Sequence, residues 1–137
     1  MADSVRVVEY FYVTVPQKPG VGAALLNELR QAGVNLLALS GFPSGRGAQI
    51  DFIPEDGAAF RAAAKKAKWK VTGPKKAFLL AGDDRPGAVA EVLQKLADAK
   101  INVMAVDAAC AGSGRYGAIL WVAPRDVPRA ARTLGAA

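Results

Sequence analysis

An internal repeat constrains this chain more than any other feature of its sequence. With a shift of 67 residues, residues 19–47 align with residues 86–114, and ten of the 29 aligned positions are identical. Chance would give about two identities, because the common residue types each make up roughly 7% of proteins. Beyond Gly47 the best shift becomes 70, which predicts three extra residues near positions 115–117. One supersecondary unit therefore occurs twice.

Each repeat alternates segments of strand and helix character. β-Branched and aromatic residues predict strands, apolar residues spaced by three and four predict helices, and Pro or Gly marks the ends. In the first repeat the expected strands are 7–15, 34–39, 48–53 and 69–72, the expected helices are 21–32 and 54–67, and a turn is expected at 41–47. In the second repeat the expected strands are 77–81, 101–109 and 116–123, and the expected helices are 89–96 and 125–134.

The resulting order, β-α-β-β-α in each repeat, specifies a ferredoxin-like sandwich, in which one antiparallel sheet packs two helices on one face. We predict an α+β fold with two ferredoxin-like βαββαβ units, residues 1–72 and residues 73–137. The second repeat has no strand of its own after its last helix, whereas residues 5–15 are long for a single strand. We therefore hypothesise that residues 5–8 supply the missing edge strand of the second repeat, while residues 10–15 begin the first.

The residue composition excludes several kinds of catalysis. The chain has no histidine, which excludes histidine-dependent triads and metal sites, and its one cysteine, Cys110, can form neither an internal disulfide nor a thiolate cluster. The acid pairs Asp83/Asp84 and Glu55/Asp56 each lie at a helix start, where acids favour the dipole, and no facing group completes an acid–base pair. We expect no enzyme activity, no catalytic residue, no metal and no cofactor.

The net charge of +6 invites comparison with nucleic-acid-binding proteins. Six lysines lie within residues 65–76, and RNA-recognition modules share the βαββαβ order. Their third strand carries stacking aromatics, however, and neither residues 46–53 nor residues 115–122 have that pattern. We interpret the lysines as a solvated helix face and linker, and RNA binding is the lesser alternative function.

Hydropathy argues against a membrane protein. Hydrophobic residues make up 52% of the chain, but no run of 18 apolar residues exists and no secretory signal is visible at the start. We therefore expect a cytoplasmic protein that does not bind membranes.

The segment from Asp83 to Leu93, followed by Ile101-Asn102-Val103, closely resembles the ACT domain. That family shows a strand, a D-x-P-G turn into a helix, and a second strand entered through a hydrophobic-Asn-hydrophobic step. The first repeat has a weaker form of both motifs, with Gln17 in place of the usual acid. The resemblance covers nearly the whole chain as two tandem copies. It implies a stand-alone regulatory module that binds a free amino acid and acts as a homodimer or on a partner enzyme or transporter.

The Pro-Gly turn also has the chemistry of a carboxylate site. A helix start offers unpaired backbone N–H groups and the positive end of a dipole. Glycine allows close approach of a ligand, and proline in the first turn sacrifices no donor. Side-chain oxygens could bind the ligand's ammonium, and the resemblance places the site between two units. The candidate ligand-binding residues are Asp83, Asp84, Arg85, Pro86, Gly87, Ala88, Val89, Asn102 and Val103 in the second repeat, and Lys18, Pro19, Gly20, Val21, Asn35 and Leu36 in the first.

Each of these features also has a structural interpretation. A Pro-Gly turn is a common helix start, and Asn35 and Asn102 could cap the turn into a strand through side-chain bonds to the backbone. Cys110 could be a small apolar residue. A ligand-free oligomerisation module is therefore the main alternative function.

Overall fold

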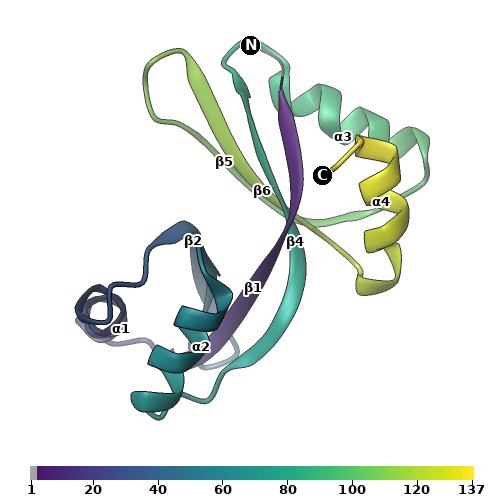
Figure 1. Cartoon of the computed structure of the whole chain (residues 1–137). Helices are drawn as coiled ribbons and strands as arrows, with labels where there is room; N and C mark the ends of the chain where they lie inside the picture. Colours follow the sequence, from purple (N-terminus) through teal and green to yellow (C-terminus); the bar gives the residue numbers. More distant parts are fainter. Residues whose placement is uncertain (1–2) are drawn as a thin grey trace. The chain divides into compact units, whose positions relative to one another are not determined.

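The computed structural model describes residues 3–137, and the fold is α+β (Figure 1). It contains the strands β1 (Ser4–Pro16), β2 (Leu36–Ser44), β3 (Gly47–Pro54), β4 (Thr72–Asp83), β5 (Val103–Cys110) and β6 (Arg115–Val122), and the helices α1 (Val21–Gln31), α2 (Gly57–Lys66), α3 (Ala88–Asp98) and α4 (Val127–Leu134). A 3-10 helix, η1 (Pro124–Asp126), precedes α4. Among the described residues, no helix is both long and apolar enough to cross a membrane.

The chain divides into two compact units, which we call the first unit (Glu9–Lys75) and the second unit (residues 3–8 with Lys76–Ala137). Strand order in the first unit is β2-β3-β1-β4, and in the second unit it is β5-β6-β4-β1. Both orders follow the same path through a ferredoxin-like βαββαβ unit. The expected ranges are 1–72 and 73–137. The two compact units differ from them chiefly because residues 3–8 belong to the second unit and not to the first.

Two long strands serve both units. β1 has 13 residues and β4 has 12, and each contributes its start to one unit and its end to the other. In the second unit the start of β1 also holds the C-terminus, because the Val7 N–H donates to the Ala137 carbonyl (3.1 Å) and the Ala137 N–H donates to the Val5 carbonyl (3.0 Å). The hypothesis that residues 5–8 complete the edge of the second repeat is confirmed.

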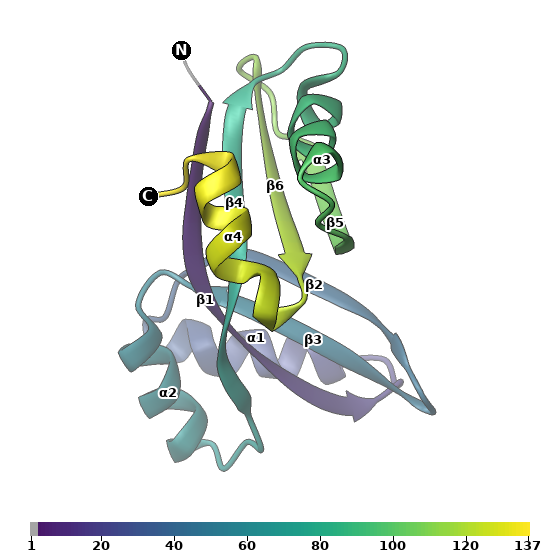
Figure 2. The same cartoon turned by 90° about the vertical axis from the view of Figure 1, so that its right-hand side faces the viewer.

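In each unit the two helices cover one face of the sheet. The second unit buries Leu80 of β4 and Leu120 of β6 against Leu96 of α3 and Ala130 of α4, and Figure 2 shows α3 and α4 on the same side of these strands.

The first unit buries an aromatic cluster instead. The Phe60 ring of α2 lies 4.9 Å from Phe11 of β1 and 5.3 Å from Phe52 of β3, measured between ring centroids. Leu29 of α1 joins the same core. Burial of such apolar surface stabilises each unit.

Several predicted boundaries are wrong. β2 continues through Ser44, so the turn expected at residues 41–47 is confined to Gly45 and Arg46. Residues 69–71 are not a strand, and the start of β4 at Thr72 supplies the last strand of the first unit. β3 and β6 both have eight residues, so the extra residues of the second repeat lie outside the strand, in its hairpin and in the η1 connection.

Candidate functional site: a pocket at each Pro-Gly turn

Both Pro-Gly turns place a glycine in left-handed backbone immediately before a helix. Gly20 has a φ of 89° and precedes α1, and Gly87 has a φ of 82° and precedes α3. A Cβ at either position would meet no atom within 4 Å. The need for glycine therefore comes from the backbone conformation and not from crowding.

These two helices begin without a side-chain cap. The capping residue of each is a glycine, which has no side chain to accept a hydrogen bond, and the first helical N–H of each, at Val21 and Ala88, donates back to a turn carbonyl. α2 begins differently, because the Asp56 carboxylate accepts from the N–H groups of Ala58 (3.0 Å) and Ala59 (3.2 Å). The starts of α1 and α3 thus offer amide donors to an external acceptor.

In the second unit the helix start opens onto a pocket of about 390 Å³, within the range of about 300–1,000 Å³ found for small-molecule sites. Most of its lining side chains are small and apolar, and its polar side chains come from the turn and from β6. The pocket is lined by Asp84, Arg85, Gly87, Ala88, Val89, Ala90, Ala108, Ala109, Cys110 and Tyr116.

The arginine at this pocket is held in an ion-pair cluster. Arg85 Nη2 lies 2.6 Å from Glu91 Oε2 and 3.3 Å from Asp3 Oδ2, and its Nη1 donates to the Asp83 carbonyl at 3.0 Å. The Asp83 carboxylate accepts from Arg115 Nη1 at 2.8 Å. Both arginines near the turn are therefore engaged with acids of the same unit.

Asp84 brings a carboxylate to the pocket beside the Cys110 thiol. A hydrogen bond between the two side chains, followed by the cost of desolvation, raises the pKa of Cys110 above its ordinary value. A raised pKa lowers the thiolate fraction at neutral pH, which is the opposite of an activated nucleophile. Cys110 is exposed, so it can still report on the pocket.

Tyr116 forms the buried part of the lining. The residue is 5% exposed, and its hydroxyl has no hydrogen-bond partner among residues 3–137. Burial, and then the nearby charge of Asp3, raise the pKa of Tyr116.

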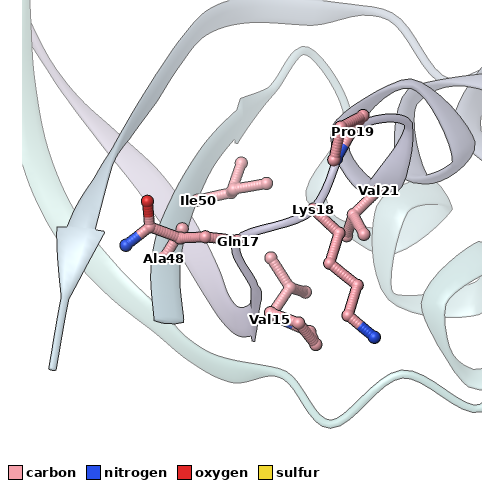
Figure 3. A pocket seen from close by; sticks show the side chains of 9 residues that line it. Val15, Gln17, Lys18, Pro19, Val21, Ala48 and Ile50 are labelled. Carbon is pink, nitrogen blue, oxygen red and sulfur yellow. The ribbon is translucent and has the colours of Figure 1, made fainter. Parts of the chain in front are cut away.

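The first unit has a pocket at the equivalent place, of about 360 Å³ (Figure 3). Val15, Ala48 and Ile50 line it from the strands, and Pro19 and Val21 line it from the turn and α1. Figure 3 shows the Lys18 side chain extending away from Ala48 and Ile50. Its remaining lining residues are Pro16, Gln17, Lys18 and Gly22.

The structure brings together only part of the predicted site. Asp84, Arg85, Gly87, Ala88 and Val89 line the second-unit pocket, whereas Pro86 lies in the turn and Asp83 ends β4. In the first unit Lys18, Pro19 and Val21 line the pocket, and Gly20 lies in its turn.

The two asparagines and their neighbours lie elsewhere in their own units. Asn102 and Val103 stand where β5 begins, whereas the pocket contacts the other end of that strand. Asn35 and Leu36 stand at the corresponding end of β2, where Asn35 Nδ2 donates to Glu55 Oε2 at 3.0 Å and the Asn35 carbonyl accepts from the Glu55 N–H at 2.9 Å. Neither bond joins the Asn35 side chain to the backbone, so the structural interpretation of Asn35 as a side-chain cap stays a prediction.

Sequence reasoning missed the strand residues of both pockets. Ala108, Ala109 and Tyr116 reach the second pocket because antiparallel pairing sets Cys110 opposite Tyr116, and Tyr116 opposite Gly82. That register depends on pairing between distant segments. The sequence signal that could have identified Tyr116 as a lining residue is its position close after the glycine-rich hairpin.

Comparison with known proteins supports the fold. No protein-family model matches the chain, and no curated protein matches it in sequence. Among solved structures, a protein from Bacteroides thetaiotaomicron superposes with a TM-score of 0.81 at 18% identity, over 96% of this chain and 88% of that one. The ligand-free regulatory subunit of aspartate kinase from Thermus thermophilus superposes with a TM-score of 0.66 at 15% identity, over 98% and 95% of the two chains. The regulatory subunit of aspartate kinase from Thermus flavus gives 0.62 at 14% identity, over 98% and 95%. At these identities the similarity establishes the fold, which is ACT-like.

Proposed function

We propose that this protein is a regulatory module that binds a free amino acid at the Pro-Gly pocket of the second unit. One observation carries the proposal: an uncapped helix start, preceded by a left-handed glycine, opens onto a 390 Å³ pocket that also holds the Asp84 carboxylate. Amide donors and an acid side by side match the two charges of an amino acid.

The ligand's carboxylate would accept hydrogen bonds from the Gly87 and Val89 amides, because the Ala88 N–H already donates to the Arg85 carbonyl, and its ammonium would lie against Asp84. Asp83 is the weaker candidate for the ammonium because Arg115 already donates to it. Asn102 stands at the far end of β5 and joins the site only through a second copy of the chain. The first-unit pocket offers Lys18 and Gln17 in place of Arg85 and Asp84, and lacks an acid in its lining, so we expect weaker binding there.

Regulation follows if binding changes how the protein pairs with itself or with a partner enzyme or transporter. Coupling of about 1–3 kcal/mol between two sites is sufficient for such control. The fold shared with regulatory subunits of aspartate kinase supports a regulatory rather than a catalytic role.

A thermal-shift screen tests the proposal. The full chain is heated with each of the twenty amino acids at millimolar concentration, and with a short single-stranded RNA as the comparison. A ligand that binds only the folded state raises the unfolding temperature in proportion to RT ln(1 + [L]/Kd). A rise with one amino acid or one chemical group of them supports the proposal. A rise with RNA alone would contradict it and favour the exposed lysines as a phosphate-binding surface.

An oligomerisation module is the second candidate, and the edge strands favour it. β5 is exposed along nearly its whole length, with Met104 63% exposed, and β2 presents Leu39 and Phe42 at 43% and 41%. Unpaired edge strands are ready to pair with another chain. If no amino acid shifts the unfolding temperature but sedimentation shows a dimer that Met104→Lys dissociates, this function replaces the first.

A further inference from the structure

We propose that the exposed face of α2 and the turn after it bind the phosphate backbone of a double-stranded nucleic acid, without reading its sequence. This basic surface consists of Arg61, Lys65, Lys66, Lys68 and Lys70. It follows α2 into the turn before β4 and lies wholly in the first unit (Figure 2). None of its residues lines either Pro-Gly pocket, so the inference goes beyond the amino-acid site and does not depend on it.

The first step is the charge of this surface. Residues 57–82 contain seven lysines and arginines and no acid. All five side chains of the basic surface are exposed, and among residues 3–137 none of them forms an ion pair. The nearest acids in the sequence are engaged elsewhere, because Asp56 caps the start of α2 and Glu55 binds Asn35. The positive charge of the surface is therefore not neutralised within the described chain.

The second step compares this helix with another exposed helix of the chain. The outward face of α3 carries Glu91, Lys95 and Asp98, a mixture of both signs. Such mixing is typical of a helix face that only contacts water. The outward face of α2 has alanines and cations alone. The charge pattern of α2 thus differs from that of an ordinary solvated helix.

The helix dipole does not explain the whole surface. Cations are favoured near the C-terminal end of a helix, and Lys65 and Lys66 lie in the last turn of α2. Arg61 lies one turn earlier, and Lys70 lies beyond the helix, whereas the effect of the dipole is confined to the last turn. The stability of α2 therefore requires only part of the basic surface.

The third step is the class of partner. The large hydrophobic side chains exposed on the described chain are Leu26, Leu39, Phe42, Met104 and Val106. None of them lies within residues 57–71. Protein interfaces are enriched in aromatic residues and methionine and depleted in lysine, and membrane-surface helices insert apolar side chains. Phosphate contacts need only positive charge and hydrogen-bond donors. The basic surface has the composition of a phosphate-binding surface.

The fourth step separates a duplex from a single strand. Proteins that bind single strands stack the bases on aromatic side chains. Trp69 lies between two lysines of the surface, but its ring packs in the core, 5.9 Å from Phe52 and 6.2 Å from Phe60 between ring centroids. The surface therefore has no ring on which a base can stack. A duplex presents its phosphates at regular intervals, about 3.4 Å along the axis for each strand, and needs no stacking.

Fluorescence anisotropy of a short labelled DNA duplex, titrated with the full chain, tests the proposal. We expect the affinity to fall with salt with a log–log slope no steeper than about −4.5, which is 0.9 for each of five cations. The double variant Lys65→Gln/Lys68→Gln should flatten that slope by about 1.8. Duplexes of unrelated sequence, and duplex RNA, should behave alike, because phosphate is the group they share.

The matched control is Lys95→Gln/Lys100→Gln. It removes the same charge at the end of α3, where Lys100 has the same left-handed backbone as Lys68, with φ of 59° and 62°. The control should keep the wild-type slope. An equal loss in both double variants would mean that net charge alone attracts the duplex, and it would overturn the proposal.

Competitors identify the partner class. Absence of duplex binding at low salt, or tighter binding of a single strand of the same sequence, would overturn the proposal. So would displacement of the duplex by poly-glutamate or by phosphatidylserine vesicles at a lower concentration of negative charge than unlabelled duplex requires. The amino-acid response in the thermal-shift screen should be the same in Lys65→Gln/Lys68→Gln as in the wild type. The two proposals can therefore fail separately.

Discussion

Gly20 and Gly87 are the two residues on which the geometry of the pockets depends. Each has a positive φ, and each leaves open space where a side chain would stand. Left-handed backbone costs a residue with a side chain about 1–2 kcal/mol, and more when that side chain is β-branched. Because the two glycines occupy equivalent turns, the same substitution can be made at one pocket and, as a control, at the other.

We predict that Gly87→Val abolishes amino-acid binding by the second-unit pocket while the chain still folds. Valine would move the turn and place a branched side chain over the amides of α3. Gly20→Val is the matched control, because it carries the same backbone strain in the first unit. Calorimetry should show lost affinity in the first variant and retained affinity in the second. Equal affinity in both variants would place the ligand elsewhere.

Cys110 gives a pH-dependent prediction. The hydrogen bond to Asp84 raises the thiol pKa, so the folded chain keeps its proton at pH values where a free cysteine has begun to lose it. We predict that Asp84→Asn lowers the pH midpoint of iodoacetamide alkylation and speeds the reaction at neutral pH. Asp98→Asn, which changes an exposed acid of α3 bonded to Gln94, is the control. A pH profile unmoved by Asp84→Asn would contradict the contact.

At the scale of elements, local patterns were sufficient to predict every helix. The Pro-Gly turns start α1 and α3 as expected, and Asp56 caps α2, where an acid at a helix start was identified. Strand ends were less predictable, because a strand ends where its partner ends. β2 continues to Ser44 only because β3 pairs with it up to Gly47.

The site was predicted only in part for the same reason. The residues of the turns could be identified because a single stretch of chain carries the motif. Tyr116 and the alanines of β5 could not, because they reach the pocket through strand register. Asn102 shows the converse. It belongs to the same sequence motif as the turn, but it lies where β5 begins, whereas the pocket contacts residues at the end of β5.

The contrast between capped and uncapped helices is testable. Asp56→Ala should lower the free energy of unfolding by about 0.5–2 kcal/mol, because it removes the acceptor for two amides of α2. Urea denaturation measures the change, and Asp56→Asn should restore most of it. Amino-acid affinity should stay the same in both variants, since α2 lines neither pocket.

The shared strand gives a second prediction at this scale. Removing residues 2–8 should reduce amide-exchange protection in β4 and α4, because the second unit loses its edge strand and the bonds of Val5 and Val7 to Ala137. Asp3→Asn is the control, because it removes the ion pair with Arg85 but keeps the strand. It should leave the amide-exchange protection of β4 unchanged. Full protection of the second unit in the shortened chain would contradict its reliance on β1.

At the scale of the whole molecule, the two units repeat one topology but not one chemistry. Each has a Pro-Gly pocket of similar size, 360 and 390 Å³. Only the second lines its pocket with an acid, a thiol and a buried phenol. β1 and β4 each contribute residues to both units.

Alkylation of Cys110 in the presence of a ligand tests the central claim most directly. Cys110 is the one cysteine of the chain, it is exposed, and it lines the second-unit pocket. The rate of iodoacetamide modification is measured for the full chain with and without each amino acid that raises its unfolding temperature, and again for Gly87→Val. We predict that a saturating amino acid slows the reaction in the wild type and has no effect on the rate in Gly87→Val. An unchanged rate in the wild type, under conditions where calorimetry shows the amino acid bound, would contradict a binding site at the second Pro-Gly turn.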